Sequence, residues 1–197
     1  MIEGLKKEVK HLLSRERWEH TQRVVEMAGQ LLANHRYPLD PQRVQTAALL
    51  HDCAKDLSLS GQLKKAGDFG IVLTSSDLLC PQTLHGPVGA GMARHMFGIV
   101  DRDILQAIAL HTTGGPRMTA LAKIIFVADY VEPGRHFLGV DKLRTLAEQN
   151  LDEAVLACMN HSLAYLLRRG NLIHRRMIAA RNYLLAIKLY PGSREEG

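Results

Sequence analysis

Residues 47–56 read Ala-Ala-Leu-Leu-His-Asp-Cys-Ala-Lys-Asp, and this stretch is the most informative in the chain. An apolar helical segment ends here in an adjacent histidine and aspartate, His51 and Asp52. Burying two such groups behind Leu49 and Leu50 is costly unless something pairs them. A metal ion is a favourable partner, because a neutral imidazole and a carboxylate are both good ligands for borderline divalent ions. Neighbouring side chains on a helix diverge by about 100°, so one can ligate one ion while the other reaches toward a second.

Three further histidines and one aspartate occur in the same unusual context, at the edge of an apolar segment. They are His20, His85, His111 and Asp129. A single histidine in such a place is most often a satisfied core residue, and Asp129 alone could pair with a nearby lysine or arginine. Taken together with His51 and Asp52, however, they predict that six side chains converge on metal ions.

Apolar residues recur at helical spacing along nearly the whole chain. The clearest segments are predicted helices at residues 1–13, 14–35 and 175–190. Further helices are predicted to start at aspartates that can cap them, which are Asp40, Asp101, Asp141 and Asp152. We therefore predict an all-α protein, a single bundle of roughly eight to ten helices joined by short loops.

Two segments depart from the simple helical pattern. Residues 67–84 contain two glycines, a proline and a Thr-Ser-Ser-Asp cluster, which predicts a loop or short helices. Residues 124–127, Ile-Ile-Phe-Val, favour a strand by propensity. They lie within a helical pattern, so we predict a buried helix there.

The composition is that of an ordinary globular protein. The chain has 197 residues, 46% hydrophobic and 23% charged, so a single domain over residues 1–197 is expected. No apolar run approaches the roughly 18–20 residues of a membrane helix, and the N-terminus lacks the apolar region of a secretory signal. Three scattered cysteines without a Cys-x-x-Cys pair suit a reducing compartment, so a cytoplasmic location is expected.

The chain is basic, with 25 Lys and Arg against 20 Asp and Glu and a formal net charge of +5, which favours anionic partners. The densest basic patch is the run at residues 168–181. Such a run is usually a solvated face, although a nucleic-acid footprint would look similar. Aromatic residues are not interleaved with it, which disfavours stacking on single strands. A third interpretation is that part of the patch borders a pocket and attracts a polyanionic nucleotide.

The ordered pattern His20, His51-Asp52, Asp129, with His85 and His111 between them, resembles the two-metal members of the HD-domain superfamily of metal-dependent phosphohydrolases. Longer motifs are similar to the bacterial symmetrical diadenosine-tetraphosphate hydrolases of the YqeK type. These motifs lie at residues 17–20, 50–55, 84–87, 111–114, 128–135 and 180–182. The similarity covers about residues 15–190. It implies an HD-type metal core over about 15–135, with C-terminal helices over about 140–190 packing on it.

This resemblance implies a di-metal hydrolase that cleaves diadenosine tetraphosphate symmetrically to two ADP. The implied nucleophile is a metal-activated hydroxide that attacks phosphorus. The implied cofactors are two divalent or mixed-valence ions, most often iron in the family, although Mn, Co, Ni and Zn suit the same ligands. The implied metal ligands are His20, His51, Asp52, His85, His111 and Asp129.

Residues near these ligands are candidates for catalysis and substrate binding. The expected catalytic residues are Asp52, as the bridging ligand, and Lys55, which lies one helical turn after His51. Lys55 could instead be a lysine that interacts with the dipole at a helix C-terminus. The expected substrate contacts are Arg17, Thr113, Arg135, Arg181 and Asn182.

Two other functions stay open from the sequence. Many HD-type nucleotidases and phosphatases that act on mononucleotides share the same metal core. A non-catalytic nucleotide- or nucleic-acid-binding module would use the basic patch. The expected partners are the dinucleotide substrate and ADP- or GDP-like nucleotides. Neither nucleic acid nor a membrane is expected, and a homodimer is a further option.

Overall fold

A computed structural model describes residues 2–190 of the chain, and this range is helical with no strand. The elements are α1 (Ile2–Leu12), α2 (Arg15–His35), α3 (Pro41–Leu50), α4 (Leu59–Asp68), α5 (Ser75–Leu79), the 3-10 helix η1 (Pro81–Thr83), α6 (His85–Met96), α7 (Arg102–Leu110), α8 (Ala120–Val131), α9 (Val140–Gln149), α10 (Leu151–Arg168) and α11 (Arg175–Leu189). The all-α prediction is confirmed, and ten of the eleven α-helices in this range have at least seven residues.

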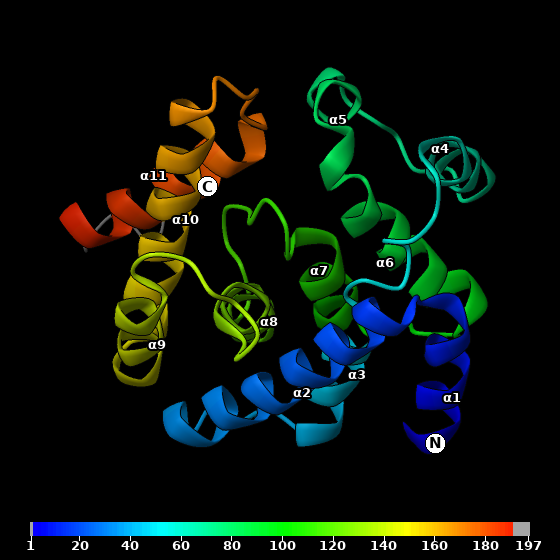
Figure 1. Cartoon of the computed structure of the whole chain (residues 1–197), viewed down its shortest axis with the longest axis horizontal. Helices are drawn as coiled ribbons and strands as arrows, with labels where there is room; N and C mark the ends of the chain where they lie inside the picture. Colours follow the sequence, from blue (N-terminus) through cyan, green and yellow to red (C-terminus); the bar gives the residue numbers. More distant parts are fainter. Residues whose placement is uncertain (1, 191–197) are drawn as a thin grey trace.

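Helix α8 lies at the centre of the arrangement. Figure 1 shows it end-on, between α7 on one side and α9 and α10 on the other, and α2 packs against it as well. Its apolar residues surround most of the helix, as expected of a helix packed on all sides, and Ile124 and Ile125 are completely buried. Residues 124–127 are helical, as predicted, because burial against other helices outweighs their strand propensity.

The helix starts confirm some of the predicted caps and correct others. The side chains of Asp40 and Asp101 accept hydrogen bonds from the first turns of α3 and α7, as predicted. The predicted caps Asp141 and Asp152 are wrong, because Gly139 and Asn150 occupy the N-cap positions of α9 and α10. Both aspartates lie in the first turn instead. A carboxylate there still interacts favourably with the helix dipole.

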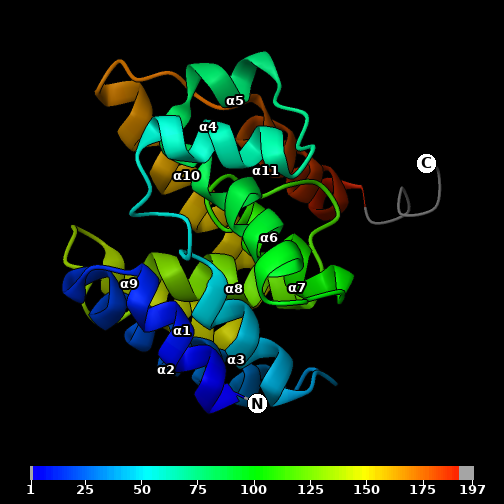
Figure 2. The same cartoon turned by 90° about the vertical axis from the view of Figure 1, so that its right-hand side faces the viewer.

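The segment at residues 67–84 contains the end of α4, the short α5 and η1, as predicted. Figure 2 shows α4 and α5 together at one end of the molecule, opposite α1 and α2. A buried hydrogen bond joins this segment to the start of α11, where His174 Nε2 donates to Asp77 Oδ1 at 3.1 Å. One member of the basic patch is thus a structural contact. No helix within residues 2–190 has both the length and the apolar character needed to cross a bilayer.

Gly114 is a tight packing point shortly after α7. Its φ is +63°, and a Cβ at this position would overlap Met159 Cε and lie 3.4 Å from Ala180 Cβ. Met159 is completely buried, so its side chain has little room to move aside. We expect Gly114→Ala to lower the free energy of unfolding by about 2–5 kcal/mol, from backbone strain of about 1–2 kcal/mol and overpacking of about 1–3 kcal/mol. Urea denaturation measures this loss.

Gly170 provides a matched control for that substitution. Its φ is +64°, and nothing lies within 4 Å of a Cβ built there. Gly170→Ala should therefore show only the backbone strain, about 1–2 kcal/mol. Equal losses in the two variants would mean that the packing around Gly114 does not constrain the chain.

Candidate metal centre

Six polar side chains from five helices and their ends meet beside α8. They are His20 in α2, His51 and Asp52 directly after α3, His85 at the start of α6, His111 directly after α7, and Asp129 in the last turn of α8. Three sets have ligand atoms that lie within 4.8 Å of one another: His20, His51 and Asp52; His51, His111 and Asp129; and Asp52, His85 and His111. Helices α3 and α7 pack against each other and against α8, so their polar ends reach the same place. These are the six residues for which the sequence predicted convergence.

Asp52 lies in the middle of the cluster and faces histidines with both of its oxygens. Oδ1 is 3.2 Å from His85 Nε2 and 3.3 Å from His111 Nε2. Oδ2 is 3.5 Å from His51 Nε2 and 3.7 Å from His20 Nε2. Each oxygen faces a different pair of imidazoles. The carboxylate therefore has the position expected of a ligand that would bridge two cations.

In two of the imidazoles, the ring nitrogen that points away from the cluster, the outer nitrogen, is hydrogen-bonded to the backbone. His51 Nδ1 lies 2.6 Å from the carbonyl oxygen of Ala48, and His111 Nδ1 lies 2.7 Å from that of Ile108. A carbonyl can only accept, so each Nδ1 carries a proton, and in the neutral imidazole each Nε2 presents a lone pair to the cluster. Such outer partners are typical of metal-ligating histidines.

Two of the inner nitrogens, His20 Nε2 and His51 Nε2, are buried without a hydrogen-bond partner. His51 Nε2 is completely buried and forms no hydrogen bond, which is rare for a buried polar atom. The lone pair of His111 Nε2 faces His85 Nε2 at 3.2 Å, and burial lowers the pKa of His85 to about 4. Two neutral imidazoles this close need a shared proton or a cation between them. The residues present therefore fit divalent metal ions.

Both carboxylates of the cluster are ionised at neutral pH. Burial alone would raise the pKa of Asp52, but the adjacent His51 and the other imidazoles around it hold it well below its ordinary value. Burial would likewise raise the pKa of Asp129, whereas the neighbouring His20 and the nearby positive charges lower it strongly. Two anions in a buried setting require compensating positive charge.

Three cationic side chains surround these carboxylates. Arg17 Nη1 donates to Asp52 Oδ2 at 2.8 Å, and Arg135 Nη2 donates to Asp129 Oδ1 at 2.7 Å. Lys55 Nζ lies 3.3 Å from His85 Nε2, and partial burial lowers the pKa of Lys55. Lys55 and two of the expected substrate contacts, Arg17 and Arg135, thus lie at the cluster.

An HD domain model matches residues 17–134, a range that contains all six clustered side chains. The chain belongs to the HD domain family. The resemblance noted in the sequence is thereby confirmed at the level of the family, and the metal-ligating chemistry of the donor set agrees with it. The identity of the metal is a separate question.

Relatives of this HD domain protein carry a more specific name. The symmetrical bis(5'-nucleosyl)-tetraphosphatase of Halalkalibacterium halodurans is 38% identical, with 90% of this chain and 93% of the relative covered. That of Staphylococcus aureus is 36% identical, with 92% and 93% covered. A crystal structure of a predicted HD superfamily hydrolase involved in NAD metabolism, from Clostridium acetobutylicum, has a TM-score of 0.90 and 35% identity, and covers 94% of this chain and 97% of its own.

Three of the expected substrate contacts lie away from the cluster or are already engaged. The Thr113 hydroxyl is buried and donates to the carbonyl oxygen of Gly114 at 2.9 Å. Arg181 donates to Asn160 and Asn182 within the α10–α11 pair. Within residues 2–190, none of the three bonds to the six clustered side chains.

Glu132 is the residue whose role the sequence did not reveal. Only 1% of it is exposed, directly after α8, and its Oε1 lies 3.1 Å from His20 Nδ1. Burial would raise the pKa of Glu132, but a hydrogen bond from Arg23 and further donors lower it below its ordinary value. The available signal was a carboxylate that ends an apolar helix, next to Asp129 in the same motif.

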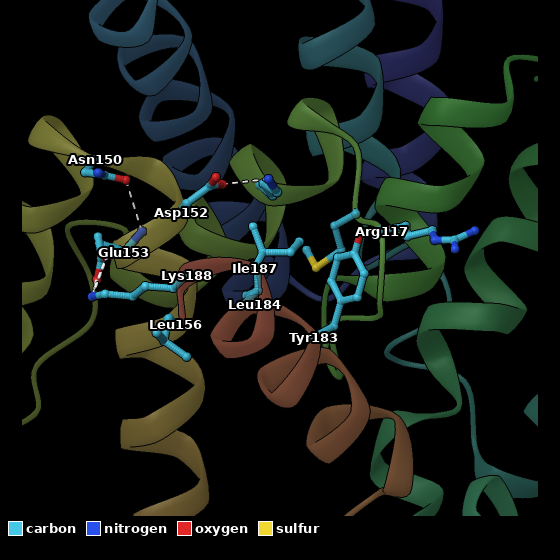
Figure 3. Close-up of a pocket in the computed structure, with 11 residues that line it drawn as sticks. Arg117, Asn150, Asp152, Glu153, Leu156, Tyr183, Leu184, Ile187 and Lys188 are labelled. Carbon is cyan, nitrogen blue, oxygen red and sulfur yellow. Dashed lines mark hydrogen bonds and ion pairs between the residues drawn. The ribbon is translucent and has the colours of Figure 1, made fainter. Parts of the chain in front are cut away.

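A large cavity lies apart from the metal centre, between the N-terminal turns of α8 and α10 and the side of α11 (Figure 3). It has a volume of about 800 Å³, and Tyr183 and Arg117 are among its lining residues. Two ion pairs cross it, Lys123 with Asp152 at 2.6 Å and Lys188 with Glu153 at 2.7 Å. None of the six clustered side chains lines this cavity, so its volume does not measure the metal site.

Proposed function

We propose that this HD domain protein hydrolyses diadenosine tetraphosphate symmetrically and gives two ADP. One observation carries the proposal: three relatives that match at least 90% of the chain are named symmetrical bis(5'-nucleosyl)-tetraphosphatase. The buried cluster of imidazoles and carboxylates supports it, because hydrolysis of a phosphoanhydride is a reaction that such a donor set serves when it holds metal.

In this proposal the six clustered side chains would hold two divalent ions, with Asp52 as the expected bridging ligand. The holding residues are His20, His51, Asp52, His85, His111 and Asp129. A bound ion of this kind lowers the pKa of water and neutralises charge on phosphoryl oxygens. We propose iron as the metal. Imidazole and carboxylate ligands suit Mn, Co, Ni and Zn as well, and elemental analysis of the purified protein decides among them.

The cationic side chains at the cluster then bind and orient the polyphosphate. Arg17, Lys55 and Arg135 lie close enough to the carboxylates to meet phosphate oxygens at the same place. Symmetrical hydrolysis adds the oxygen of water to one central phosphorus and breaks its bond to the central bridging oxygen, which leaves with the second ADP. Fixed positive charges stabilise the negative charge that develops on this leaving group.

The reaction products test the proposal against its alternatives. Purified protein is incubated with diadenosine tetraphosphate, and the nucleotides are separated by chromatography, with chelator-treated protein as the control. ADP as the sole nucleotide product is expected. An ATP and AMP pair would contradict symmetrical cleavage. Phosphate release from mononucleotides with the dinucleotide untouched would favour the phosphatase alternative, and binding without turnover of either substrate would favour a non-catalytic module.

A further inference from the structure

We propose that Glu132 is a positioning residue that sets the tautomer and orientation of His20 toward the metal centre. Its Oε1 lies 3.1 Å from His20 Nδ1, and both side chains are buried. An ionised carboxylate can only accept a hydrogen bond, so it keeps the proton of His20 on Nδ1. His20 Nε2 then points into the cluster, 3.0 Å from Asp129 Oδ1, where a metal ion held between the two would take its lone pair.

The second oxygen of Glu132 is fixed by donors, which leaves the first for His20. Arg23 Nε donates to Oε2 at 2.6 Å, and the backbone N–H of Gly134 donates to it at 2.5 Å. A Cβ at position 134 would collide with the Arg23 guanidinium, so a glycine here allows that approach. The carboxylate therefore has one defined orientation, with Oε1 directed at the imidazole.

The backbone that carries Glu132 is held from α9. Arg144 donates to the carbonyl oxygens of Val131, Glu132 and Arg135 at 2.9, 3.0 and 2.8 Å. The same short loop also supplies Arg135, which bonds to Asp129. One loop, fixed by one arginine, thus positions groups that act on two of the clustered side chains.

His20 differs in this respect from two other imidazoles of the cluster. The outer nitrogens of His51 and His111 face backbone carbonyls, whereas that of His20 faces a charged carboxylate. A carboxylate makes the imidazole a more basic ligand and fixes its ring, and loss of such a partner typically weakens metal binding about 10–100-fold. The inference rests on the metal centre of the proposed function, but not on the identity of the substrate.

Glu132→Gln tests the inference because it changes charge and donor pattern without changing shape. With Arg23 and Gly134 still donating, the glutamine oxygen should face them and its NH2 group should face His20. That NH2 group can only donate, so the proton of His20 should move to Nε2 and block the lone pair. We expect metal affinity, measured by competition with a chelator, to fall about 10–100-fold. Nitrogen-15 NMR of metal-free protein should show His20 Nδ1 protonated in the wild type and unprotonated in Glu132→Gln, with the His20 signal assigned from His20→Gln.

Two further variants separate positioning from loop stability. Arg23→Gln removes the guanidinium partner but keeps the contact between Glu132 and His20, so it should lower the melting temperature and leave the His20 tautomer unchanged. Glu132→Asp keeps the charge and should retain the Nδ1–H tautomer and more metal than Glu132→Gln. Wild-type tautomer and metal affinity in Glu132→Gln, or an equal loss of metal in Arg23→Gln, would overturn the inference. These readouts use no nucleotide, so failure to hydrolyse the dinucleotide would overturn the proposed function alone.

Discussion

Asp52→Ala should abolish metal binding and hydrolysis together. Asp52 contacts four imidazoles of the cluster through its two oxygens and is only 3% exposed. Without it, the imidazoles lose their central anion and Arg17 loses its partner. Metal assistance to phosphoryl transfer is worth several kcal/mol, and each 1.36 kcal/mol is a factor of ten. We therefore expect kcat to fall by at least about 10³-fold, with metal content well below that of the wild type.

Metal stoichiometry by elemental analysis and ADP formation by chromatography measure the two effects on the same preparation. Asp56→Ala is a matched control, because Asp56 lies four residues further on, is exposed, and accepts a backbone hydrogen bond from Ser14. It should keep both metal and activity. Asp52→Asn retains the shape of the side chain and guards against a folding defect. Full metal occupancy in a folded Asp52→Asn or Asp52→Ala protein would contradict the assignment of Asp52 as a bridging ligand.

The cluster could be predicted from the sequence because a buried polar residue stands out next to the apolar residues around it. His51, His111 and Asp129 each follow an apolar run that would otherwise continue into the core, and that context is visible without any structure. The helices were visible for the same reason, since hydrophobic spacing reports which face is buried. Even the strand-like residues 124–127 could be assigned to a helix from the pattern around them.

Features that depend on contacts between residues far apart in the sequence could not be predicted in this way. Glu132 and His20 are 112 positions apart, and nothing local to Glu132 shows that its acceptor faces an imidazole. Thr113 is similar, because only the fold shows that its hydroxyl is buried against Gly114. The cap of α9 was misplaced because Gly139 begins that helix with a φ of +92°, without a side-chain hydrogen bond. In a sequence, a glycine marks the start of a helix less clearly than an aspartate does, and Asp141 lies only two residues after Gly139.

Lys55→Met should lower kcat by about 10²–10³-fold while leaving the metal in place, as expected when one fixed donor to a developing charge is removed. Lys55 is partly buried beside the cluster, and its Nζ lies 3.3 Å from His85 Nε2. Within residues 2–190 it forms no ion pair with a carboxylate, so its charge is available to a phosphate. Methionine fills a similar volume without charge. Lys64→Met is the control, because Lys64 is exposed on α4 and pairs with Asp68 in the same helix.

The measurement is kcat at saturating diadenosine tetraphosphate together with metal stoichiometry. Lys55→Arg, which keeps the charge but changes its shape, should retain more activity than Lys55→Met, because a fixed positive charge is the property that the polyphosphate needs. A wild-type kcat in Lys55→Met would remove the catalytic role assigned to this residue. Loss of metal in the same variant would instead make Lys55 a support for His85, since the ammonium group then acts on the ligand and not on the phosphate.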